Sequence, residues 1–125
     1  MSKALLVVLG IINLLFVGFH VFLGYRLHML TGVPDGVRGL LETFNACCSL
    51  VIALLAYAFL TRSKDVLSTG LGAAVLTFGA LLYFSRAAAE YIWLAGSLPI
   101  ALVCITVGLL HALALFSVRT GKQGA

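Results

Sequence analysis

The hydrophobic and polar positions of this chain alternate in long blocks, not at the two-residue spacing of a strand. Four predominantly apolar stretches run over about residues 4–30, 37–60, 66–89 and 98–118. About 20 apolar residues in a helix reach across the hydrocarbon core of a bilayer, because each residue adds about 1.5 Å. We therefore expect an all-α integral membrane protein that crosses the bilayer four times.

Short polar segments separate these stretches. Residues 31–36 contain two glycines and a proline, which a helix interior rejects, and residues 61–65 form a brief polar connection. Pro99 suits the first turn of the last helix. The first stretch is longer than the apolar region of a signal peptide, so we expect it to be retained. Short connections predict an antiparallel four-helix bundle that forms one domain over residues 1–125.

Composition supports this interpretation. Hydrophobic residues make up 62% of the chain and charged residues 10%, whereas soluble domains are roughly 45–50% apolar and about 25% charged. The net charge is +4, but no basic run is interleaved with aromatic residues, so nucleic acid is not an expected partner. The expected partner of the apolar surface is the lipid bilayer.

The charged residues predict an orientation. Positive residues favour the cytoplasmic side of a membrane. The amino terminus, the second connection and the tail together hold more basic residues than the opposite side. We therefore expect both termini in the cytoplasm, and we expect a bacterial inner (plasma) membrane. The cytoplasmic set is Lys3, Arg62, Lys64, Arg119 and Lys122, and the outer set is Arg26, Arg38 and Arg86 with Asp35, Glu42 and Glu90.

Each predicted helix carries a stripe of small or polar residues. Spacings of three, four and seven place each stripe on one helix face. Small residues allow helix backbones to approach closely in a membrane, so these faces are expected to point into the bundle or, alternatively, into a dimer interface. The stripes are Asn13, Val17, His20 and Gly24; Asn45, Ser49, Ala53 and Ala56; Gly72, Gly79, Tyr83, Arg86 and Glu90; and Ala101, Cys104, Gly108 and His111.

Depth along the helices divides the polar residues into two levels. Asn13 and His111 form a predicted inner pair near the cytoplasmic side. The outer level forms a candidate polar pocket for an anionic headgroup or a small polar substrate. Two of its members, Arg86 and Glu90, are four residues apart on one helix, and this charge pair can instead simply anchor the helix end. The pocket candidates are His20, Arg26, Glu42, Asn45, Arg86 and Glu90, with Cys48 and Cys104 at the same level.

Histidine and cysteine are the candidates for metal chemistry. An ionisable side chain within a membrane is a functional-site hypothesis by default, so His20 and His111 are each a metal or haem ligand, part of a proton relay, or a hydrogen-bonded structural residue. About 10–14 Å separates their depths, too far for one shared ion. Free cysteine usually packs as a small buried hydrophobe. The one soft-metal cluster that the sequence suggests consists of His20, Cys48 and Cys104.

Known catalytic motifs are absent from the sequence. It contains no HExxH, nucleotide-binding loop, GxSxG or CxxC, so an enzyme is not favoured and no catalytic residue or cofactor is assigned. Three function classes remain, in this order. The first is an accessory subunit, assembly factor or regulator that acts through helix contacts within a larger membrane complex. The second is a homo-oligomeric transport or permeation protein for a small solute or ion. The third is a metal- or haem-binding redox protein, or a membrane enzyme with its site in the outer half.

Overall fold

Five α-helices make up most of the described chain. The computed structural model describes residues 2–93 and 97–123, with side chains for residues 3–92 and 97–118. No strand occurs among these residues, and four of the helices are long and apolar enough to cross a membrane, judged by length and composition. The prediction of an all-α chain with four long apolar helices is confirmed. The helices are α1 (Ser2–His28), α2 (Asp35–Thr61), α3 (Ser63–Ser68), α4 (Gly70–Trp93) and α5 (Leu98–Gln123).

The third predicted helix, residues 66–89, differs most from its expected range. A separate short helix, α3, occupies part of the predicted polar connection, and α4 begins only at Gly70. Thr69 separates the two helices because its backbone is extended, with φ −109° and ψ 158°. Its hydroxyl donates to the Asp65 carbonyl at 2.8 Å and accepts from the Gly72 amide at 2.9 Å. Thr69 therefore ends α3 and acts as the N-cap of α4.

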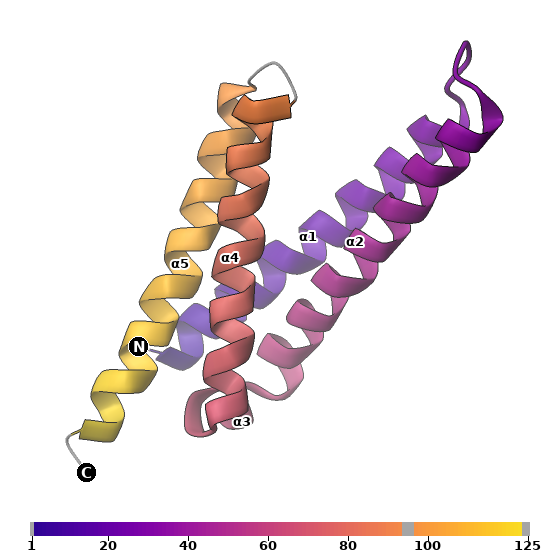
Figure 1. Ribbon diagram of the computed structural model, residues 1–125. Coiled ribbons are helices and arrows are strands. Elements are labelled where there is room, and N and C mark those ends of the chain that lie inside the picture. Colours follow the sequence, from indigo (N-terminus) through magenta and orange to yellow (C-terminus); the bar gives the residue numbers. More distant parts are fainter. Residues whose placement is uncertain (1, 94–96, 124–125) are drawn as a thin grey trace.

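The long helices form two hairpins. α1 and α2 pack along each other, and so do α4 and α5. The turn between α1 and α2 contains Gly32 with φ 79°, a left-handed conformation that glycine adopts without steric cost. Figure 1 shows that the hairpins meet where α3 and both termini lie, and that they diverge towards the opposite ends. We call the end where the hairpins meet the closed end. The opposite end, where they diverge, is the open end.

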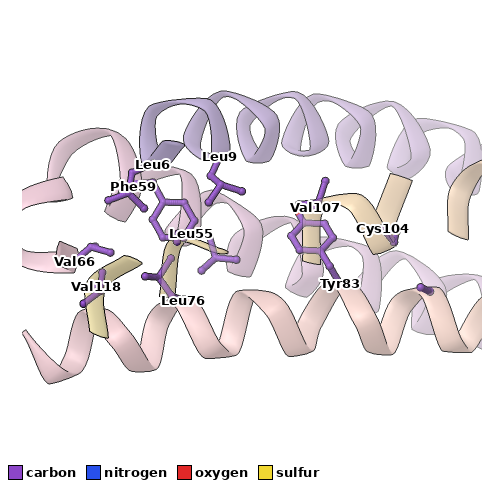
Figure 2. Close-up of a cluster of buried hydrophobic side chains, with 12 residues drawn as sticks. Leu6, Leu9, Leu55, Phe59, Val66, Leu76, Tyr83, Cys104, Val107 and Val118 are labelled. Atoms are coloured by element: carbon purple, nitrogen blue, oxygen red, sulfur yellow. The ribbon is translucent and has the colours of Figure 1, made fainter. Parts of the chain in front are cut away.

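Large apolar side chains hold the two hairpins together at the closed end. Residues from α1, α2, α3, α4 and α5 contribute to one buried cluster. Figure 2 shows part of this cluster gathered around Phe59, with Tyr83, Val107 and Cys104 further along α4 and α5. The cluster members nearest the closed end are Leu6, Leu9, Leu55, Phe59, Val66, Leu76, Ala114 and Val118.

The predicted four-helix bundle is formed only in part. Residues 14–28 of α1 and 35–51 of α2 include no buried residue, whereas buried positions continue along the length of α4 and α5. The stripes on this half of α1 and α2 face each other: Asn45 hydrogen-bonds to His20, and its amide nitrogen lies 3.0 Å from the position of a Cβ on Gly24. These residues therefore satisfy one another without α4 and α5. We call residues 14–28 and 35–51 the arm.

Candidate functional site at the helix junction

Buried polar side chains from three helices meet where the hairpins cross. Asn13 of α1 and His111 of α5 are fully buried, and Tyr83 of α4 lies between them. The Tyr83 hydroxyl donates to Asn13 Oδ1 at 2.9 Å, and Asn13 Nδ2 donates to the Leu9 carbonyl at 2.8 Å. The structure thus connects the predicted inner pair, Asn13 and His111, through Tyr83 and not by a direct hydrogen bond.

The His111 ring contacts residues of α2, α4 and α5. Its Nδ1 donates to the Val107 carbonyl at 2.8 Å, because a carbonyl only accepts. The imidazole centroid lies 5.4 Å from the ring centroids of both Phe59 and Tyr83. Nε2 is buried and has no hydrogen-bond partner among the described residues. This ring therefore joins α5 to α2 and α4 at one point.

Gly79 provides the space for the His111 ring. A Cβ placed on Gly79 would lie 2.2 Å from His111 Cδ2 and 2.6 Å from Nε2. The imidazole consequently packs directly on the backbone of α4. Nε2 is the nitrogen that a metal or a haem iron would bind here, and it faces this backbone. The arrangement in the structure suits packing between hairpins better than ligation at Nε2.

In the arm, His20 and Asn45 form a reciprocal pair. His20 Nδ1 donates to Asn45 Oδ1 at 2.8 Å, and Asn45 Nδ2 donates to the His20 carbonyl at 2.9 Å. Both side chains are half-buried between α1 and α2. Nearer the open end, His28 Nδ1 lies 3.2 Å from Glu42 Oε1, and the Arg26 guanidinium lies 6.0 Å from the Phe22 ring centroid.

The charge pair of α4 ties that helix to the start of α5. Arg86 Nη1 donates to Glu90 Oε2, and the Ser97 amide donates to Glu90 Oε1 at 3.1 Å. The Glu90 side chain is 4% exposed, whereas that of Arg86 is 42% exposed. The buried carboxylate is therefore neutralised from one side and hydrogen-bonded from the other, as a buried charge requires.

The outer-level candidates do not come together as one pocket. Because the hairpins diverge, the arm carries one part of the set and the α4–α5 hairpin carries the other. Among the described residues no three His, Cys, Asp or Glu side chains form a group able to hold a metal ion, so His20, Cys48 and Cys104 do not form a cluster. Cys48 is exposed and Cys104 is buried. The arm holds His20, Arg26, Glu42, Asn45 and Cys48, and the second hairpin holds Arg86, Glu90 and Cys104.

The sequence did not predict that Tyr83 and Phe59 complete the junction with the inner pair. Tyr83 lies on the predicted stripe four residues after Gly79, which places both on one helix face. That spacing is a usable signal for a tyrosine that reaches the inner pair. Phe59 has no comparable signal, because it is one of many large apolar residues in α2.

Compared with known protein families, curated protein sequences and solved structures, the chain shows no match.

Proposed function

We propose that this chain is a small four-span membrane protein that serves as an accessory subunit, assembly factor or regulator of a larger membrane complex. Its four long apolar helices are compatible with a membrane, which we take to be a bacterial plasma membrane. The closed end, with both termini, faces the cytoplasm. The arm contacts a transmembrane partner through helix–helix packing.

One observation carries this proposal: the chain does not cover its own arm. No residue of 14–28 or 35–51 is buried, although these segments are helical and apolar. Phe16 packs against Tyr83 of α4, but the other aromatic side chains of the arm are at least half exposed: Phe19 50%, Phe22 56%, Tyr25 60% and Phe44 61%. Aromatic residues are enriched in the cores of protein interfaces. A partner that packs on the arm would complete the outer half that the α4–α5 hairpin leaves unfilled.

Site-specific photo-crosslinking in the native membrane tests the proposal. A benzophenone amino acid replaces Phe22 or Phe44 of the arm, and matched variants carry it at Leu71 of α4 and Leu113 of α5. These two leucines are 76% and 57% exposed and lie outside the arm. We expect one discrete protein adduct from the arm positions and only lipid adducts from the controls. Lipid adducts alone at Phe22 and Phe44 would contradict the proposal.

A second variant separates partner binding from folding. The double substitution Phe22→Ala and Phe44→Ala should abolish co-purification of the crosslinked partner while leaving the melting temperature in detergent within a few degrees of the wild type. Leu71→Ala with Leu113→Ala is the matched control and should retain the partner. An adduct with a second copy of this chain would instead indicate a homo-oligomer, in agreement with the transport alternative.

A further inference from the structure

An apolar groove lies between α2 and α4, and along α2 it extends from Val51, the last residue of the arm, to Ala58. Its lining is entirely apolar and includes Leu54, Leu55 and Ala58 of α2 with Val75 and Phe78 of α4. Leu55 is buried at the floor, whereas Leu54 and Phe78 are 67% and 49% exposed at the rims. The groove is therefore a recess in the surface that the chain would turn towards lipid.

The size of the groove matches a hydrocarbon chain. Its volume is about 420 Å³. An apolar protein cavity of about 150 Å³ takes up benzene, which has six carbon atoms, so this groove has room for roughly fifteen to twenty carbons. The lining extends over Val51–Ala58, about 10 Å along α2, so the groove receives a segment of one fatty acyl chain. A transmembrane helix is about 10–12 Å across with its side chains and would insert only single side chains into the recess.

Basic residues lie in the segment that joins the two helices of the groove, residues 62–69, which we call the foot of the groove. Ala58 lies one turn before the end of α2 and Ala74, also in the lining, lies one turn after the start of α4. Helix α3 connects these two helix ends. Arg62 directly precedes α3, and its side chain is 63% exposed beside Asp65, at 2.7 Å. Lys64 in the first turn of α3 is exposed and has no ion pair among the described residues.

We propose that the chain binds one anionic phospholipid at α2, α3 and α4, with an acyl chain in the groove and the phosphate held by Arg62 and Lys64. The charges are complementary: the foot carries two cations against the single carboxylate of Asp65. Lysine and arginine near a cytoplasmic leaflet attract anionic lipids. The inference rests on the bilayer location and orientation proposed above, but it does not depend on the partner of the arm.

Native mass spectrometry of the delipidated protein tests this site. The probes are palmitoyl-oleoyl phosphatidylglycerol and palmitoyl-oleoyl phosphatidylcholine, which share their acyl chains and differ in headgroup charge. We expect the wild type to retain one phosphatidylglycerol about tenfold more tightly than phosphatidylcholine, since each basic residue near the headgroup favours the anionic lipid several-fold. Equal retention of the two lipids by the wild type would overturn the headgroup assignment.

Two kinds of variant locate the lipid. Arg62→Gln with Lys64→Gln should remove the preference for phosphatidylglycerol, whereas Arg26→Gln at the open end should keep it. Ala74→Phe fills the groove and should reduce retention of both lipids, whereas Ala88→Phe, an exposed α4 position outside the lining, should not. The side chains changed at the foot are exposed, so these variants are expected to fold, and a melting curve checks this.

Two results would contradict the assignment of an acyl chain to the groove. If the Ala74→Phe variant retains lipid like the wild type, the acyl chain of the lipid does not lie in the groove. If a photo-crosslinker at Phe78 labels a protein and not a lipid, the groove is a protein contact and the proposal fails. The arm adduct at Phe44 should persist in Ala74→Phe, so failure of the lipid site and failure of the proposed function give different results.

Discussion

At the scale of single residues, the junction depends on polar side chains placed inside an apolar contact. Asn13, Tyr83 and His111 are buried there, and the first two are joined by a hydrogen bond across helices. Interhelical hydrogen bonds in membranes contribute about 0.6 kcal/mol on average and at most about 1.7. The polar contacts are therefore modest in energy, and the steric fit of His111 against Gly79 is the stronger determinant of how α4 and α5 meet.

Substitution of Gly79 tests this fit. We expect Gly79→Ala to lower the free energy of unfolding by about 1–3 kcal/mol, because the new methyl group overlaps the His111 ring in a closely packed site. Titration with sodium dodecyl sulfate in mixed micelles, followed by circular dichroism, measures the change.

Gly18 offers a matched control within α1. No atom of another helix lies within 4 Å of the place that a methyl group on Gly18 would take, so Gly18→Ala should be neutral or slightly stabilising through helix propensity. Combining Gly79→Ala with His111→Ala should cost less than the sum of the two single changes, because the clash is gone. Additive losses would mean that the imidazole does not rest on α4.

At the scale of helices, one residue separates α3 from α4. The Thr69 hydroxyl accepts from the Gly72 amide and donates to the Asp65 carbonyl, so it stabilises both helix ends. Gly72 allows α3 to fold back on α4, since a Cβ there would lie 2.1 Å from the Val66 carbonyl oxygen. The foot of the lipid groove therefore depends on this short turn.

Removing the cap tests its contribution. Thr69→Ala should lower the free energy of unfolding by about 1 kcal/mol, the usual loss when an N-cap hydroxyl is removed. Thr69→Ser keeps the hydroxyl and should lie close to the wild type in the same micelle titration. If alanine and serine behave alike, the hydroxyl does not cap α4.

At the scale of the whole molecule, the two ends differ in charge. The closed end carries Lys3, Arg62 and Lys64 against Asp65, whereas the charges at the open end are mixed in sign. An excess of positive residues favours the cytoplasmic side. The side chains of Arg119 and Lys122, also assigned to the cytoplasmic set, lie outside the described residues.

Cysteine labelling in intact cells tests the orientation. In a variant without native cysteines, Asp35→Cys at the open end should react with a membrane-impermeant maleimide. Lys64→Cys should react only after the cells are permeabilised, because the proposed topology puts this position on the cytoplasmic side. Labelling of both positions after permeabilisation is the control for accessibility. The reverse pattern in intact cells would invert the proposed topology.

Local patterns in the sequence were enough to predict the four long helices and which faces carry small residues. Apolar length and helical spacing are properties of each segment alone, so they are readable without a structure. The same patterns placed Asn13 and His111 at one depth, and the structure connects them through Tyr83.

The tertiary structure alone decided how the helices pair. A stripe of small residues can face either neighbour, and on the arm His20 and Asn45 satisfy each other. Large apolar residues such as Phe59 and Leu76 then join the hairpins at one end only. This packing involves side chains far apart in the chain, so the divided outer level, the uncovered arm and the groove between α2 and α4 could not be predicted from any single helix.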